Sequence, residues 1–171
     1  MAKNTRASKI SILLHDIRSV HNVGSIFRTA DAFGVSKIYI SGYTPSPKDR
    51  FGRMRSDIAK VALGAELSVP WEEIASTDIA DVAAFVQNLK KSGTQIVTLE
   101  QDAKSVSLSD ATLQGISDTS DILLIPGNEV GGVSRELLDL ADLIAEIPMR
   151  GTKESLNVSV ATGIALFALS H

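Results

Sequence analysis

The sequence contains no cysteine, few aromatic residues and no long apolar run. Without cysteine the chain has no disulfide, no thiolate nucleophile and no cysteine-ligated zinc. The three histidines (His15, His21 and His171) lack the spacing of metal ligands, so we expect no metal cofactor. Apolar runs such as 10–14 are far shorter than the roughly 20 residues of a membrane span, and the N-terminus has no signal-peptide core. These absences predict a soluble, cytoplasmic protein with no membrane partner.

The length and composition favour one domain. The chain has 171 residues, of which 44% are hydrophobic, and this allows one good core but hardly two. No segment is rich enough in glycine, serine or proline to be a linker. We therefore expect residues 1–171 to form a single domain, with no separate N-terminal RNA-binding domain.

The net charge of −3 hides a strong division along the chain. Residues 1–60 carry eleven lysines and arginines against four acidic residues, and the rest carry six against sixteen. One basic group consists of Lys3, Arg6 and Lys9, and a second lies in a proline-containing segment: Lys48, Arg50, Arg53, Arg55 and Lys60. Clustered cations suit RNA phosphates, because each neutralised phosphate releases counterions. A solvated surface loop explains the second group equally well.

Short apolar runs alternate with amphipathic segments. The runs read as buried strands at 10–14, 37–40, 95–99, 122–125 and 143–147, with a shorter one at 67–69. Helices are predicted at 22–33, 79–91, 134–141 and 158–170. This alternation predicts an α/β fold with a mostly parallel sheet and helices on both faces. The last helix is nearly apolar all round, so its own core or a second subunit must bury it, which points to a homodimer.

Three polar segments follow predicted strands, where open α/β sheets bind ligands. In the first, Asn22 can cap a helix and Arg28 can pair with Asp31. The second is rich in glycine and holds Glu129, but lacks the spacing of dinucleotide and phosphate loops. In the third, Ser155-x-Asn157 can simply cap the last helix. Each segment alone therefore has a purely structural explanation.

Together the three segments resemble the motifs of the SpoU, or TrmH-like, branch of the SPOUT RNA 2′-O-ribose methyltransferases. The matching residues are Asn22-x-Gly24-x-Ile26-x-Arg28-Thr29-Ala30, then Gly127-x-Glu129-x-x-Gly132-x-Ser134, then Ile147-Pro148-Met149 with Ser155-Leu156-Asn157-Val158-Ser159. The resemblance covers nearly the whole chain. Three ordered motifs at matching separations are highly specific.

The resemblance implies a fold that periodicity does not predict. In the family, the C-terminal segment is threaded into a deep trefoil knot that binds S-adenosyl-L-methionine, against the general rule that chains are unknotted. The backbone positions that hold this cofactor correspond here to Leu99, Gly127, Ile147 and Leu156. The family's active site is usually completed across a homodimer, in agreement with the apolar last helix.

The resemblance also implies methyl transfer from S-adenosyl-L-methionine to a ribose 2′-hydroxyl of tRNA or rRNA. Arg28 would place fixed positive charge beside the developing oxyanion, since guanidinium holds its proton too tightly to act as a simple base. The other predicted catalytic residues, which would position Arg28, the ribose or a phosphate, are Asn22, Glu129, Ser155 and Asn157. The alternative is a non-catalytic assembly factor or sensor that binds RNA and S-adenosyl-L-methionine.

Overall fold

The computed structural model describes residues 9–108, 116 and 120–170. Seven strands in this part of the chain form one sheet in the order β3-β2-β1-β6-β4-β7-β5. The strands are β1 (Ile10–His15), β2 (Lys37–Ser41), β3 (Trp71–Glu73), β4 (Gln95–Leu99), β5 (Val106–Ser107), β6 (Ile122–Pro126) and β7 (Leu143–Glu146). The helices are α1 (Val20–Ala32), α2 (Ser56–Ala62), α3 (Ala65–Ser68), α4 (Ile79–Lys91), α6 (Arg135–Leu138) and α7 (Val158–Leu169).

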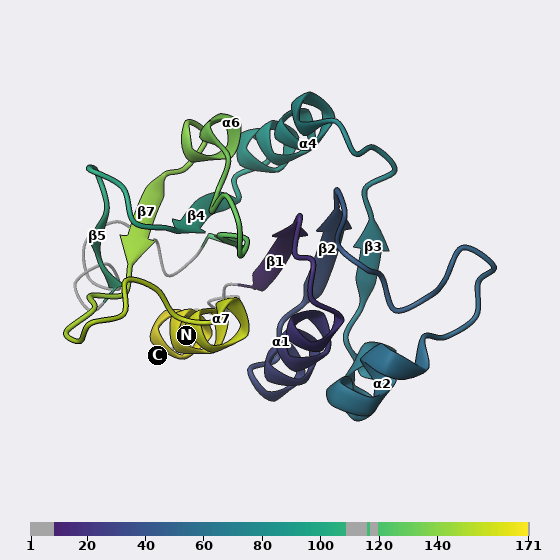
Figure 1. Cartoon of the computed structure of the whole chain (residues 1–171). Coiled ribbons are helices and arrows are strands. Elements are labelled where there is room, and N and C mark those ends of the chain that lie inside the picture. The colour runs from purple at the N-terminus through teal and green to yellow at the C-terminus, as the bar shows by residue number, and fades with distance from the viewer. Residues whose placement is uncertain (1–8, 109–115, 117–119, 171) are drawn as a thin grey trace, which may run out of the picture.

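Every strand pair in this sheet is parallel. Helices α4 and α6 cover one face, and α1, α2 and α7 cover the other (Figure 1). The prediction of an α/β fold with a mostly parallel sheet and helices on both faces is confirmed. The trefoil knot stays a prediction.

The core consists of two apolar clusters, one on each side of the sheet. Ile12 and Leu14 of β1 belong to the cluster that includes α1 and α7, whereas Leu13 belongs to the cluster that includes α4. Successive side chains of a strand point to opposite faces, so β1 contributes to both clusters. The central strand β6 is buried along its whole length, which is why its sequence is a continuous apolar run.

The short strand predicted at 67–69 is wrong. Leu67 lies in α3, and the backbone N–H of Val69 donates to the carbonyl of Ala65 (2.9 Å), which closes the last helical turn. Only beyond Pro70 does the chain extend, and Trp71 then pairs with Ile38 of β2. The strand therefore forms four residues later than predicted, after the backbone has left the helix.

Some predicted helix boundaries are also corrected. Helix α1 begins two residues before Asn22, because the Ser19 side chain accepts the N–H of Asn22 (3.2 Å) and caps the helix. Within the predicted helix 134–141, the α-helix α6 spans only Arg135–Leu138, and the Ser134 side chain makes no hydrogen bond that caps it. Helix α4 has the predicted bounds. Helix α2 and strand β5 were not predicted.

Two further observations bear on the predictions from composition. No helix within the described part of the chain has the length and apolar character that a membrane span needs. Lys3 and Arg6 of the first basic group, and His171, lie outside the described residues, whereas Lys9 is exposed and its backbone N–H donates to the Asp121 carboxylate (3.1 Å).

Candidate active site

A cavity of about 490 Å³ lies at the carboxyl ends of β4, β6 and β7. Residues of three segments line it, within 99–101, 126–132 and 146–161. Each segment leaves the end of one strand, so the parallel arrangement brings them to the same edge of the sheet. The cavity lies within the range of about 300–1,000 Å³ that is usual for small-molecule sites.

The four predicted cofactor positions all lie on this cavity. Leu99 is the last residue of β4, and Gly127 follows β6 directly. Ile147 follows β7, and Leu156 lies shortly before α7. The structure thus places these four residues around one space, although they are far apart in the sequence.

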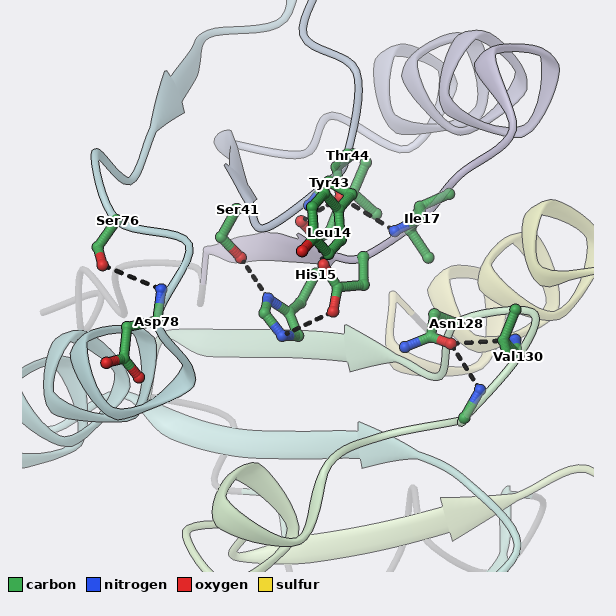
Figure 2. Close-up of polar contacts among 12 residues, drawn as sticks. Leu14, His15, Ile17, Ser41, Tyr43, Thr44, Ser76, Asp78, Asn128 and Val130 are labelled. Atoms are coloured by element: carbon green, nitrogen blue, oxygen red, sulfur yellow. Dashed lines mark hydrogen bonds and ion pairs between the residues drawn. The ribbon is translucent and has the colours of Figure 1, made fainter.

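The glycine-rich segment after β6 is a tight turn. Asn128 and Gly132 exchange two backbone hydrogen bonds (3.1 and 3.2 Å). The Asn128 side-chain oxygen accepts the N–H groups of Val130 and Gly131 (3.0 and 2.8 Å; Figure 2). Gly132 adopts a positive φ of 68°, a conformation that glycine enters without strain. The turn therefore holds one wall of the cavity in a fixed shape.

Glu100 braces this turn, and sequence reasoning missed it. Its carboxylate accepts the N–H of Val133 (2.8 Å) and of Gln101 (2.8 Å). A Cβ added at Gly127 would lie 2.6 Å from Glu100 Oε2, and one at Gly132 would be closer still. The two glycines therefore leave room for the Glu100 carboxylate. The available signal was the acidic residue that directly follows the apolar run of β4.

Three of the predicted catalytic residues form a chain of hydrogen bonds. Asn157 Nδ2 donates to Asn22 Oδ1 (3.0 Å), and Asn22 Nδ2 donates to Glu129 Oε1 (2.8 Å). Each residue comes from a different motif, on or next to α7, α1 and the glycine-rich turn. Asn22 is buried, whereas Glu129 and Asn157 are exposed and line the cavity. Their contacts tie two walls of the cavity to the start of α1.

The donor-to-acceptor direction of this series of hydrogen bonds is set at both of its ends. Asn157 Oδ1 accepts the backbone N–H of Ser159 (2.9 Å), a group that can only donate. Glu129 is the last residue of the hydrogen-bond series, and its carboxylate, when ionised, can only accept hydrogen bonds. Both asparagine amides must therefore point their NH₂ groups toward Glu129. Within the described part of the chain, the second N–H of each amide has no acceptor.

Hydrogen bonding holds Glu129 in its ionised form. Partial burial acts to raise the pKa of Glu129, but the hydrogen bonds from the Asn22 side chain and from backbone N–H groups outweigh it. The pKa consequently lies below its usual value of 4.5. At neutral pH this group is a carboxylate, which orients donors and does not supply a proton.

The other two predicted catalytic residues differ in their placement. Ser155 is exposed and lines the cavity. Arg28 is exposed on α1 and does not occur among the described residues that line the cavity. The suggested pair with Asp31 does not form in the described structure; Asp31 instead accepts the Ser68 hydroxyl (2.5 Å). Arg28 is therefore free of a carboxylate partner among the described residues.

A second polar cluster joins the ends of β1 and β2. His15 is buried, with Nδ1 2.9 Å from the Ser41 hydroxyl and Nε2 3.4 Å from the Asp16 carboxylate (Figure 2). Asp16 has a positive φ of 57° and accepts the N–H of Tyr43 (2.8 Å). The Thr44 hydroxyl donates to the carbonyl of Leu14 (3.0 Å). These contacts fix the segment that leads from β1 into α1.

The predicted RNA-binding residues do not all lie in one loop. Lys48, Arg50 and Arg53 precede α2, but Arg55 is its N-cap residue and Lys60 lies in its last turn. The loop predicted to end at Lys60 thus becomes helical at Ser56, and this corrects the prediction. Arg53 pairs with Asp49 and Arg55 with Asp57, both at 2.8 Å. Part of the local positive charge is therefore neutralised within the chain.

An open parallel sheet with a polar cavity at its carboxyl edge defines an α/β ligand-binding domain. The cavity has no phosphate loop, since its glycine-rich turn lacks the required spacing. Its ligand must instead be held by strand-end backbone and by the amide and carboxylate groups around it.

The chain belongs to the SpoU rRNA methylase family, whose sequence profile matches residues 9–167. It is 35% identical over 156 residues to the 23S rRNA (guanosine-2′-O-)-methyltransferase RlmB of Nitrosomonas europaea, covering 91% of this chain and 54% of that protein. It is 32% identical over 171 residues to RlmB of Coxiella burnetii, covering 100% of this chain and 62% of the relative. The chain thus spans somewhat more than half the length of these relatives.

Solved structures agree with this assignment. An AdoMet-bound rRNA methyltransferase from Sinorhizobium meliloti superposes with a TM-score of 0.80 at 29% identity, covering 96% of this chain and 57% of that one. The TrmH/SpoU tRNA modifying enzyme of A. aeolicus gives a TM-score of 0.77 at 28% identity, and the match covers 97% of this chain and 76% of that enzyme. The resemblance found in the three motifs is confirmed at the level of family and fold.

Proposed function

We propose that this chain transfers a methyl group from S-adenosyl-L-methionine to a ribose 2′-hydroxyl of tRNA or rRNA. The observation that carries the proposal is the hydrogen-bond chain Asn157–Asn22–Glu129, which joins all three motifs beside the strand-end cavity. The similarity to 23S rRNA methyltransferases favours rRNA as the substrate. A guanosine target is the corresponding expectation, because these relatives are guanosine-2′-O-methyltransferases.

The cavity fits S-adenosyl-L-methionine in size and in chemistry. Its backbone positions at Leu99, Gly127, Ile147 and Leu156 would hold the cofactor, and the missing Cβ at Gly127 leaves room beside Glu100. A cavity of about 490 Å³ with mixed polar and apolar walls suits a nucleoside joined to an amino acid. When bound, the cofactor supplies an electrophilic methyl group on a sulfonium.

The residues of this chain would supply position and charge. A ribose hydroxyl is a weak nucleophile at neutral pH, so a positive group beside its oxygen favours the developing oxyanion. Arg28 carries such a charge and has no carboxylate partner among the described residues. Ser155 and the second N–H groups of the Asn22 and Asn157 amides are suited to orient the ribose or a neighbouring phosphate.

Arg28 would reach an active site in a homodimer. Thr29, its neighbour on α1, lies against α7, since a Cβ built on Gly163 would be 3.5 Å from Thr29 Cγ2. Three apolar side chains on α7 are exposed: Val160, Ile164 and Phe167. A second copy that covers this face would also approach Arg28. Sedimentation of the wild type and of Phe167→Asp tests this, and a monomeric wild type at micromolar concentration would argue against it.

The activity test uses RNA from cells that lack this protein and radiolabelled S-adenosyl-L-methionine. We expect label in tRNA or rRNA at one linkage that resists alkali, because a methylated 2′-oxygen cannot attack the adjacent phosphate. Arg28→Ala should abolish transfer and leave cofactor binding largely unchanged. Lys91→Ala, which removes an exposed cation on the opposite face of the sheet, is the matched control.

Other outcomes have distinct meanings. Cofactor binding without label in either RNA pool would support the non-catalytic RNA- and S-adenosyl-L-methionine-binding alternative. Equal activity of Arg28→Ala and the wild type would remove Arg28 from the mechanism. Loss of both cofactor binding and activity in that variant would instead assign Arg28 a structural role.

A further inference from the structure

The hairpin tip, defined here as residues 48–54, connects β2 to α2 in a fixed conformation. Lys48 and Met54 form an antiparallel bridge. Between them, the N–H of Asp49 donates to the carbonyl of Arg53 (2.8 Å). Asp49 Oδ1 also accepts the N–H groups of Phe51 (2.8 Å) and Arg53 (3.0 Å). These bonds make the segment a tight turn that presents its outer side chains in defined positions.

Phe51 is exposed at this tip, at 66% of its accessible surface. A single exposed apolar side chain is ordinary and needs no explanation. The neighbours of this ring are unusual, however. The guanidinium carbons of Arg50 and Arg53 lie 4.8 and 5.1 Å from its centroid, which is the range of a cation–π contact. The ring is thus an exposed aromatic surface with two cations at cation–π distance.

The charge around Phe51 remains positive. Arg53 is paired with Asp49, and hydrogen bonds from the Arg53 backbone and side chain keep the pKa of Asp49 below its ordinary value. Asp49 is therefore ionised at neutral pH and cancels one cation. Arg50 has no acidic partner within the described residues. Residues 48–55 carry four basic side chains against one acidic side chain.

We propose that the hairpin tip binds an unpaired RNA nucleotide, with the base stacked on Phe51 and Arg50 beside its phosphate. This deepens the proposed function and rests on it for the class of substrate. Bases stack on aromatic rings and on guanidinium planes, and any unpaired base has a free face for this contact. Bases inside a duplex already stack on their neighbours, so the tip selects single-stranded regions.

The tip would contact RNA away from the reacting ribose. It projects beyond α2 at the β3 end of the sheet, whereas α7 and the cavity segments lie toward the β7 end (Figure 1). A nucleotide on Phe51 and the ribose at the cavity are therefore different parts of one RNA. The contact supplies affinity and position, and Phe51 takes no part in methyl transfer.

The test compares binding of two labelled RNAs by fluorescence anisotropy: an unstructured oligonucleotide and a blunt duplex of the same length. Phe51→Leu keeps an apolar side chain but removes the aromatic face. We expect about five- to 150-fold weaker binding to the unstructured RNA and unchanged binding to the duplex. Phe51→Trp should retain affinity for the unstructured RNA. This RNA should also quench the fluorescence of the introduced tryptophan, and the wild type, whose one tryptophan is Trp71, gives the reference signal.

The proposal is overturned if Phe51→Leu binds the unstructured RNA as the wild type does, or weakens both RNAs equally. It is also overturned if the wild type binds neither RNA. Thermal unfolding of Phe51→Leu checks that the variant is folded. Binding is measured without methyl transfer, so Phe51-dependent binding by a protein that transfers no label would overturn only the proposed function. Methyl transfer with no effect of Phe51 would overturn only this inference.

Discussion

Asn22 connects the glycine-rich turn with the residue that precedes α7, and these form two walls of the cavity. Its amide oxygen accepts a hydrogen bond from Asn157 Nδ2, and its amide nitrogen donates one to Glu129 Oε1, so Asn22 couples the positions of these two side chains. Because Asn22 is buried, no nearby solvent readily replaces either bond. One side chain thus determines how the amide and the carboxylate face the cavity.

Asn22→Ala should raise the pKa of Glu129 toward its usual 4.5, because it removes a donor that favours the charged form. The wild-type pKa is lowered, so the ionised carboxylate stabilises the folded state above the unfolded-state pKa, and this contribution is lost as the pH falls through the folded-state value. The difference in Tm between wild type and Asn22→Ala should therefore be constant near neutral pH and narrow as the pH falls below the usual glutamate pKa of 4.5.

Carboxyl-carbon NMR of Glu129 in both proteins gives the pKa directly. An unchanged pKa in Asn22→Ala would mean that the backbone N–H groups alone hold the carboxylate ionised. A Tm difference that widens on acidification would contradict the sign of the shift.

The residue types of this site could be predicted from the sequence, but their partners could not. The sequence suggested Asn22 as a helix cap, but Ser19 caps α1, because the helix begins at Val20. Glu100 was missed because its function depends on space left by Gly127 and Gly132, which are distant in the chain. Local patterns carry no information about such long-range contacts.

Helix α7 has two functions at its first turn. Asn157 is its N-cap residue and accepts the N–H and the hydroxyl of Ser159 (2.9 and 2.7 Å). The same side chain donates to Asn22. The interpretation of Asn157 as a helix cap and its place in the hydrogen-bond chain are therefore both supported by the described contacts.

Two substitutions at Asn157 separate capping from donation. Asn157→Ala removes both, and we expect a loss of about 0.5–2 kcal/mol in the free energy of unfolding together with reduced methyl transfer. Asn157→Asp retains the capping oxygen but has no N–H for Asn22, so the helix cap should be kept, the buried Asn22 oxygen should lose its donor, and methyl transfer should fall. Denaturant unfolding and the methyl-transfer assay provide the two measurements. Full activity of Asn157→Asp would show that donation to Asn22 is dispensable.

Strands were predicted correctly where burial gives a continuous apolar run in the sequence. The strands β1, β2, β4 and β6 are mostly buried, so their apolar runs identify them. β3 and β5 have three and two residues, too few for any periodic pattern. α2 was not predicted, because it follows a basic, proline-containing segment whose composition is typical of a loop.

At the scale of the whole molecule, the chain is acidic overall but basic around the hairpin tip and α2. Arg50 and Lys60 are exposed and have no carboxylate partner among the described residues, in contrast to Arg53 and Arg55. These two cations are therefore better placed for RNA phosphates than their paired neighbours. The uneven charge along the sequence indicated this basic region, and the structure shows which of its cations are paired with carboxylates.

Replacing both Arg50 and Lys60 with Gln should weaken RNA binding and lower the dependence of log K on log salt. Each lost phosphate contact should reduce the magnitude of the slope by about 0.7 to 0.9. Lys91→Gln on α4 is the control, because it removes an equivalent charge from the other face of the sheet. Titrations at several salt concentrations give the slopes. If the double variant and the control have the same slope, this surface does not contact RNA.

The strand order has a consequence for how the protein is made. β1 pairs on one side with β2, which follows soon after it, and on the other side with β6, where Ile10 is opposite Ile122. On the ribosome, β1, β2 and β3 with α1 can assemble as soon as they emerge, but the second edge of β1 stays unpaired until β6 has been synthesised. An open strand edge recruits other strands. The nascent chain therefore exposes an aggregation-prone edge from the synthesis of β1 until that of β6, and chaperones that shield such edges should matter more for its yield than for that of a protein with local strand pairing.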